Sequence, residues 1–167
     1  DGGHTFAPVS GTSVTVPAGV AGFQVRVASL DDKVFEGDEN FSLKATANGG
    51  SASGTGTIID NDGAPGVASV SNAHANEGDP LVFDVSLGGV SSKATTVVLA
   101  LADGSAKAGS DFQPAMQVSF DGGNSFTAVN GTSVSVPAGA SAFKVRVASI
   151  EDNAPESSES FKLTAST

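Results

Sequence analysis

The sequence contains no cysteine, no tryptophan and no tyrosine among its 167 residues. The absence of cysteine excludes disulfides, thiolate metal sites and cysteine nucleophiles. The absence of tryptophan and tyrosine argues against a carbohydrate-binding surface, because aromatic rings with a polar tip dominate such contacts. No uninterrupted apolar run reaches 18 residues, and no signal-peptide pattern opens the sequence. We therefore expect neither a transmembrane helix nor direct insertion into a membrane.

Cationic residues are also scarce. Eight Lys and Arg stand against 18 Asp and Glu, which gives a formal net charge of −10. Binding to nucleic acid or to an anionic membrane requires clustered Lys and Arg, and here the cationic residues are scattered. His4 and His74 have no cysteine or second histidine nearby in the sequence. No nucleophile elbow, P-loop or dinucleotide-binding glycine pattern is present, so we expect no enzymatic activity.

Short apolar/polar alternations indicate β-strands rather than helices. In LVFDVSL (81–87) and FKVRV (143–147), every second residue is apolar, and FSLKA (41–45) and FKLTA (161–165) repeat the pattern. Such alternation is typical of strands with one buried face. Turn-forming pairs such as Asn130-Gly131 separate the strands. The fold class that we predict is all-β: an antiparallel, immunoglobulin-like β-sandwich.

The chain repeats itself with a period of 120 residues. DGGHTFAPVSGTSVTVPAGVAGFQVRVAS (1–29) returns as DGGNSFTAVNGTSVSVPAGASAFKVRVAS (121–149). A period of this length predicts tandem domains. We expect residues 1–62 to be the C-terminal half of one repeat, 63–66 a linker, and 67–167 a second repeat without its last strand. The chain would then be a window on a longer array; the alternative is strand exchange with a neighbouring molecule.

Acidic residues concentrate in four segments: DDKVFEGDENF (31–41) with its copy EDNAPESSESF (151–161), Asn76–Asp79, Gly109–Phe112, and Asp60–Asp62. A solvated loop and a pocket for a hard cation are both consistent with such segments. Asp103 and Asp121 precede glycine and are expected to be turn residues, and Asp38, Glu39 and Asp79 are expected to be solvated. The Asp60–Gly63 segment is not an EF-hand, because its twelfth position is Ser71 and no helices flank it.

The ordered set of motifs EGDPLVFDVSL, DGSAKAGSDF, VPAG with FKVRVAS, DDKVFEGDENFSL and GTGTIIDND resembles the Calx-beta module. The resemblance covers essentially the whole chain. It implies a β-sandwich that binds Ca²⁺ at one end. Six to eight oxygen ligands suit this ion, and carboxylates on several loops supply them. The ligands implied by position are Asp31, Asp32, Glu36, Asp60, Asp62, Glu77, Asp111, Glu151, Asp152 and Glu156.

The second acidic loop differs from the first in ways that predict weaker binding. Glu151 replaces Asp31, Pro155 replaces Phe35, and Ser157-Ser158 replaces Gly37-Asp38. Acids remain at the three implied ligand positions, although their reach and the turn geometry change. In this chain the first loop also lacks the Glu and Asp of an N-terminal half-repeat, and the second loop lacks tail acids. Each site is therefore expected to be partial.

The resemblance implies a structural module rather than a catalyst. Calx-beta modules occur in tandem in giant bacterial surface adhesins and in sodium–calcium exchangers, and the DGG…TSVSVPAG segment is more similar to the adhesin arrays. The expected function is that of a calcium-rigidified extender in cell adhesion and biofilm formation, secreted to the bacterial cell surface, whose partners are neighbouring repeats. The alternatives are an adhesin module that recognises a glycan or another surface, and a calcium-sensing domain.

Overall fold

The computed structural model describes residues 5–153, 155 and 157–167. The chain divides into two compact units, residues 1–32 and 33–167. The described residues contain strands, turns and irregular segments, and none of them belongs to a helix. Accordingly, this part of the chain offers no helix that is long and apolar enough to cross a membrane.

All strands lie in residues 33–167, as far as the chain is described. They are β1 (Val34–Phe35), β2 (Glu39–Ala47), β3 (Gly50–Ile58), β4 (Val67–Val70), β5 (Leu81–Leu87), β6 (Val90–Ser91), β7 (Thr95–Asp103), β8 (Phe112–Ser119), β9 (Thr127–Ala128), β10 (Ser133–Val136), β11 (Ala142–Ser149) and β12 (Phe161–Ser166). The four alternating segments predicted as strands are thus found in β2, β5, β11 and β12.

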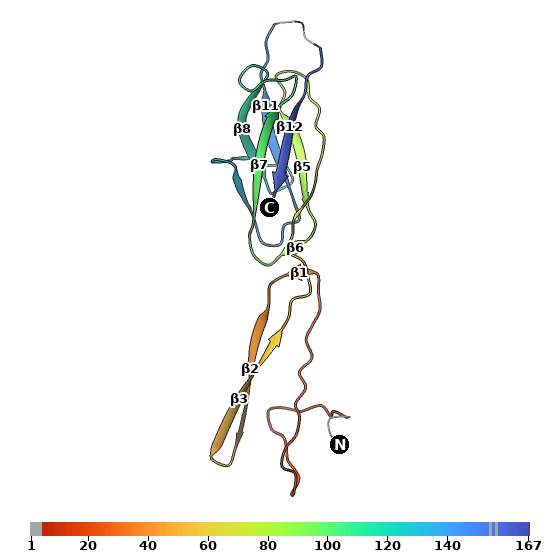
Figure 1. Cartoon of the computed structure of the whole chain (residues 1–167), viewed down its shortest axis with the longest axis vertical. Helices are drawn as coiled ribbons and strands as arrows, with labels where there is room; N and C mark the ends of the chain where they lie inside the picture. Colours follow the sequence, from red (N-terminus) through yellow and green to blue (C-terminus); the bar gives the residue numbers. More distant parts are fainter. Residues whose placement is uncertain (1–4, 154, 156) are drawn as a thin grey trace. The chain divides into compact units, whose positions relative to one another are not determined.

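Strands β4, β5 and β7–β12 form a β-sandwich (Figure 1). One sheet has the order β10-β7-β12 and the other has the order β4-β5-β11-β8-β9, with every neighbouring pair antiparallel. The inward side chains of both sheets form one apolar cluster. The predicted β-sandwich is confirmed.

The core follows directly from the alternation in the sequence. In β11, Phe143, Val145 and Val147 are buried, whereas the intervening Lys144 and Arg146 are partly exposed. A strand places successive side chains on opposite faces, so one apolar face is enough to bind it to the other sheet. Each fully buried aliphatic side chain contributes about 1.5–3 kcal/mol to folding through its removal from water.

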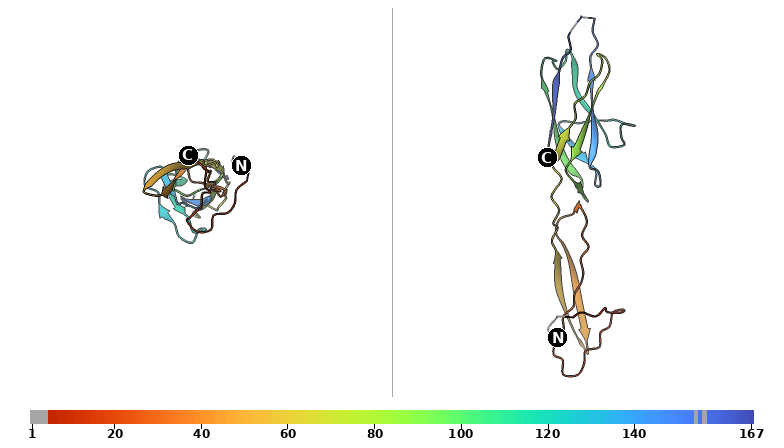
Figure 2. Two further views of the ribbon diagram at one scale, coloured as in Figure 1. Left: turned by 90° about the horizontal axis from the view of Figure 1, so that it is seen from below. Right: turned by 90° about the vertical axis from the view of Figure 1, so that its right-hand side faces the viewer.

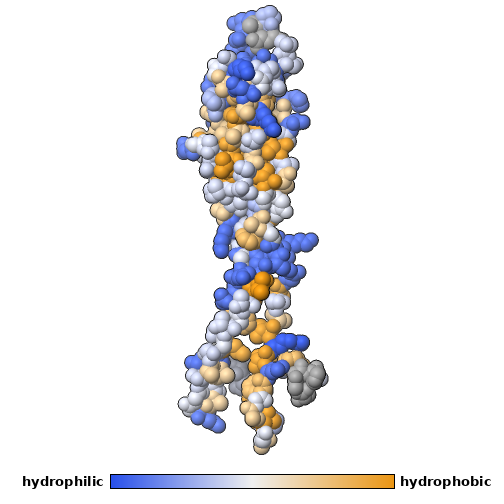
Figure 3. Space-filling model, in the orientation of Figure 1, coloured by the Kyte–Doolittle hydropathy of each residue, from blue (hydrophilic) through white to orange (hydrophobic). Residues whose placement is uncertain are grey.

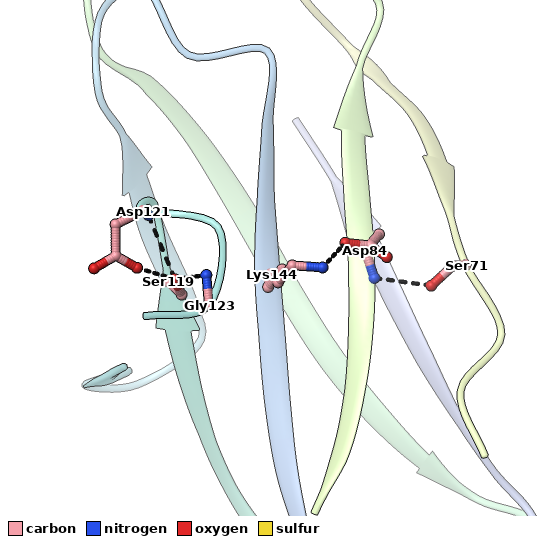
Figure 4. A network of polar contacts seen from close by, with 6 residues as sticks. All are labelled: Ser71, Asp84, Ser119, Asp121, Gly123 and Lys144. Atoms are coloured by element: carbon pink, nitrogen blue, oxygen red, sulfur yellow. Dashed lines mark hydrogen bonds and ion pairs between the residues drawn. The ribbon is translucent and has the colours of Figure 1, made fainter. Parts of the chain in front are cut away.

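Polar contacts hold the outer face of the five-stranded sheet in register (Figure 4). Lys144 and Asp84 are cross-strand partners, and the ammonium group lies 2.5 Å from the carboxylate. The backbone N–H of Asp84 donates to Ser71 Oγ over 2.8 Å. An exposed ion pair adds only about 0–1 kcal/mol, so its main effect here is on alignment of the strands.

The turn after β8 is closed by Asp121, as Figure 4 also shows. Its carboxylate accepts hydrogen bonds from the hydroxyls of Ser119 and Ser125 and from the backbone N–H of Ser125, while Gly123 N–H donates to Ser119 Oγ. These bonds favour the charged form, those of Ser119 first, and hold the pKa of Asp121 well below its usual value. The carboxylate therefore acts within its own turn.

Strands β2 and β3 form a hairpin in continuous antiparallel register from Glu39↔Ile58 to Ala47↔Gly50. Asn48 and Gly49 join them with φ of 35° and 86°. Two positive φ values at an Asn-Gly pair are the signature of a type I′ turn, whose twist matches that of a two-stranded ribbon. The ring of Phe41 lies over Gly56, where a Cβ would come within 2.5 Å of the ring. A larger residue at this position of β3 would therefore push the Phe41 ring aside.

The described residues of the unit 1–32 form no strand, although their sequence repeats that of 121–152. Val25 is 47% exposed and Val145, its counterpart, is fully buried. Figure 3 shows apolar residues at the surface of this N-terminal part. In the second copy of this sequence, β11 is paired on both sides, by β5 and β8, whereas residues 23–27 lie in no strand.

Candidate functional site

Three loops that carry predicted calcium ligands meet at one end of the sandwich. They precede β5, join β7 to β8, and join β11 to β12 (Figures 1 and 2). Several hydrogen bonds connect them directly. The backbone N–H of Ile150 donates to the carbonyl of Asp111 over 2.9 Å, and the Ser149 hydroxyl donates to the carbonyl of Asp79 over 2.7 Å. We call this region the loop end.

The Glu151 side chain reaches the loop of Glu77 at the loop end. Both glutamates are exposed, and the Glu151 side chain lies against Gly78, the residue after Glu77. A Cβ at Gly78 would lie 3.1 Å from the Glu151 carboxylate, and Gly78 has a φ of 81°. The positive φ favours glycine here, and a Cβ would also press against the Glu151 side chain. The absence of a Cβ allows the second acidic loop (151–161) to lie directly over the loop that precedes β5.

Asp111 is half-buried and is used within its own loop. Its Oδ2 accepts a hydrogen bond from the backbone N–H of Lys107 over 2.6 Å. Nearby, Asp103 Oδ1 accepts the backbone N–H of Ala108 over 3.1 Å, as expected of a turn residue. Both carboxylates satisfy backbone donors that the β7–β8 connection would otherwise expose to water. This connection is therefore an ordered platform rather than a loose acidic loop.

Asp60 follows β3 and lies away from the loop end. Its carboxylate accepts hydrogen bonds from three backbone N–H groups. Its Oδ2 accepts the N–H groups of Glu36 (2.7 Å) and Gly37 (2.6 Å), and its Oδ1 accepts the N–H of Asp62 (2.9 Å). These bonds, that of Asp62 first, hold the pKa of Asp60 below its usual value of 3.8. The side chain is therefore a carboxylate at neutral pH.

The first acidic loop is held by this carboxylate. Glu36 itself is exposed, and Gly37 has a φ of 80°, a conformation that favours glycine. Asp38 is also exposed, as expected, and its Oδ1 accepts the backbone N–H of Asp60 over 3.1 Å. The segments 36–38 and 60–62 are thus connected by bonds in both directions. Their meeting was predicted, since both were assigned to one cation site.

The remaining predicted ligands are placed as follows. Asp31 and Asp32 are exposed in the unit 1–32, Asp62 is half-buried beside Asp60, Asp152 is exposed next to Glu151, and Glu156 lies outside the described residues. Within the described ranges, no three His, Asp or Glu side chains gather closely enough to hold a metal ion. The donor chemistry fits Ca²⁺, because every implied ligand is a carboxylate. The assignment of these residues as ligands stays a prediction.

Sequence reasoning missed the pairing of β1 with β6. The two strands are parallel, with Val34 opposite Val90 and Phe35 opposite Ser91. The Nζ of Lys93, just beyond β6, donates to the carbonyl of Glu36 over 3.3 Å. Two-residue strands carry no detectable alternation, so no pattern could have predicted this pairing. The one available signal was Gly37 within an otherwise charged loop.

A scan against family models supplies the identification. The model of the Calx-beta domain matches residues 1–71, 60–130 and 119–167, which together span the chain. The chain belongs to the Calx-beta domain family. Comparisons with curated proteins and with solved structures gave no match. Calx-beta domains are β-sandwiches with structural and binding roles, in agreement with the fold described above.

Membership of the Calx-beta family bears on the loop end, because some Calx-beta domains bind calcium. In this chain, the loops of Glu77, Asp111 and Glu151 converge through the contacts of Ser149 and Ile150. Carboxylates brought to one place repel each other unless a cation or protons compensate for their charge. The loops of these three acids thus meet at one end of the sandwich, while no three acidic side chains of the described residues lie close enough together to hold a metal ion.

Proposed function

We propose that this chain is part of a tandem Calx-beta array that acts as a calcium-stiffened extender of a secreted adhesin on the bacterial cell surface. The observation that carries the proposal is the convergence of the loops of Glu77, Asp111 and Glu151 at one end of the sandwich. Its calcium ligands are the carboxylates predicted from the sequence. The partners are the neighbouring repeats, and the physiological role is cell adhesion and biofilm formation.

The mechanism is mechanical. The linker 63–66 follows directly on Asp60 and Asp62, and Pro65 within it is buried. A cation held by the tail acids and the first acidic loop would restrict the direction in which the chain leaves one repeat and enters the next. Extracellular calcium modules bind with a Kd of roughly 10⁻⁴–10⁻³ M, so millimolar calcium adds on the order of 1 kcal/mol for each site. Stiffness therefore requires several sites along the array.

Calcium is expected to raise the midpoint of thermal unfolding of this chain. One kcal/mol corresponds to roughly 4–8 °C for a domain of about 100 residues, so that is the rise expected in 5 mM calcium relative to EDTA. Circular dichroism is the suitable probe, because the chain lacks tryptophan and tyrosine. The double variant Asp111→Asn/Glu151→Gln should lose most of the calcium response.

Asp84→Asn is the matched control, because Asp84 pairs with Lys144 on the outer face of the sheet. This variant should keep the full difference between calcium and EDTA, whatever its own stability. An unchanged midpoint of the natural chain in calcium and EDTA would refute a calcium role. An equal response in Asp84→Asn and in the double variant would refute the assignment of the loop end.

A further inference from the structure

Strand β6 pairs with the first acidic loop beside the sandwich. Beside the parallel pairs Val34↔Val90 and Phe35↔Ser91, the backbone N–H of Ser92 donates to the carbonyl of Phe35 over 3.0 Å. The Lys93 ammonium then donates to the carbonyl of Glu36. Four consecutive residues of β6 and its continuation thus contact three consecutive residues of the loop. The contact is made by backbone groups and one lysine.

Strand β6, which receives the loop, is itself anchored to the sandwich. Ser91 is buried, with 6% of its surface exposed. Its carbonyl accepts the backbone N–H of Gly139 over 2.9 Å, and its hydroxyl accepts the backbone N–H of Lys93 over 3.1 Å. Gly139 belongs to the turn between β10 and β11, whose inward residues are in the core. The loop is therefore docked on a fixed strand rather than on a mobile turn.

The connecting chain closes the same contact from the other side. The Asp60 carboxylate holds the N–H groups of Glu36 and Gly37. After Asp62, the linker is fixed in turn, since Gly88 N–H donates to the carbonyl of Gly66 over 2.8 Å and Pro65 is buried near Gly89. Gly88 and Gly89 lead directly into β6. The contacts therefore form a closed circuit. The loop is bonded to Asp60, the linker after Asp60 contacts Gly88 and Gly89, and β6 after these glycines contacts the loop again.

We propose that this circuit, residues 34–37, 60–66 and 88–93, is a junction clasp that fastens consecutive repeats without a cation, and that β6 with Lys93 is the docking surface for the acidic loop of the preceding repeat. The inference rests on the proposed function, because a fixed junction matters in an extender. The clasp holds the junction in addition to the proposed calcium sites.

The hydrogen bonds that Asp60 accepts in the clasp leave its carboxylate little capacity to bind a cation. A carboxylate offers about four lone-pair directions. Two on Oδ2 are used by Glu36 and Gly37, and one on Oδ1 is used by Asp62. Asp60 can thus give a cation at most one further direction, as a monodentate ligand through Oδ1. Its main role in this conformation is to hold backbone N–H groups.

The second acidic loop is not built for the same clasp. Pro155 stands where the first loop has Phe35, and proline has no N–H to donate to a strand. Ser157 stands where Gly37 adopts its φ of 80°, a conformation that an L side chain resists. The clasp is therefore a property of the first loop sequence. A junction whose acidic loop has the first sequence is therefore clasped, and a junction whose acidic loop has the second sequence is not.

Hydrogen exchange measured by NMR on the whole chain in EDTA tests the clasp. The amides of Glu36, Gly37 and Ser92 should be protected without calcium. Asp60→Ala should speed exchange at Glu36 and Gly37 about tenfold or more, because bonds to a charged acceptor are lost. Phe35→Pro, which copies the second loop, should speed exchange at Ser92 by about the same factor. The amide of Val145 in β11 reports whether each variant keeps its fold.

Asp121→Ala is the matched control for Asp60→Ala, since Asp121 also accepts backbone and hydroxyl donors within an exposed loop. It should leave exchange at Glu36, Gly37 and Ser92 unchanged. The clasp is refuted if these amides are protected only in calcium, or if Asp60→Ala and Phe35→Pro leave their exchange unchanged. This result is distinct from failure of the calcium proposal, which shows in the unfolding midpoint and not in exchange measured in EDTA.

Discussion

Replacement of Phe112 by alanine is expected to lower the free energy of unfolding of the sandwich by about 4 kcal/mol. Phe112 is 1% exposed, and its ring stacks on that of Phe161 with centroids 4.2 Å apart and planes inclined by 22°. Phe161 in turn meets Phe83 edge to face, with centroids 5.9 Å apart. Truncation of Phe112 removes this stacking and leaves a cavity that three strands of two sheets cannot easily fill.

The same change is expected to disturb the loop end. Phe112 follows Asp111 directly, and Phe161 follows the second acidic loop. The stacked pair therefore positions both loops. Urea denaturation followed by circular dichroism measures the loss of stability. Phe120→Ala is the control, because Phe120 is 42% exposed and should lose less than about 1.5 kcal/mol. Equal losses in the two variants would contradict the assignment of Phe112 to the core.

Replacement of Leu163 by alanine is expected to lower the free energy of unfolding by about 3 kcal/mol, whereas Leu43→Ala should lower it by less than about 1 kcal/mol. The two leucines occupy equivalent positions of the repeat, in FKLTA and FSLKA. Leu163 is 5% exposed in the core between the sheets, whereas Leu43 is 43% exposed in the β2–β3 hairpin. The two variants thus make the same change at equivalent positions of the repeat, once where the leucine is exposed and once where it is buried.

Chemical denaturation of both variants, with the natural chain as reference, gives the two differences. A loss at Leu43 as large as that at Leu163 would mean that the hairpin buries its apolar face in solution. Such a result would fit strand exchange with a second molecule, and sedimentation of the natural chain would then show a dimer. Monomeric chains with a small loss at Leu43 are the expected outcome.

The β-strands of the second repeat were predictable because alternation alone determines which side chains enter the core. Leu81, Phe83, Val85 and Leu87 share one face in the sequence pattern, and β5 places the last three in the core, with Leu81 packed against it. The same pattern in FQVRV (23–27) did not produce a strand. Alternation describes which face of a strand is apolar, but it does not supply the hydrogen-bonding partners that a strand needs.

The candidate site was predictable in its outline and not in its contacts. The resemblance to the Calx-beta module implied ligands at one end of the sandwich, and the backbones of the loops of Glu77, Asp111 and Glu151 do meet at one end. The bonds of Asp60 to Glu36 and Gly37 depend on loop backbone geometry, which no sequence pattern encodes. Acidic side chains that look like ligands can equally satisfy backbone N–H groups, as Asp60, Asp111 and Asp121 do.

The most direct test of the central claim is small-angle X-ray scattering of several of these repeats in tandem, measured in calcium and in EDTA. Sites that stiffen the junctions predict a larger maximum dimension in calcium, together with a narrower distribution of repeat orientations. Addition of excess EDTA should reverse the change. An identical maximum dimension in calcium and in EDTA would contradict the proposal that calcium stiffens the array.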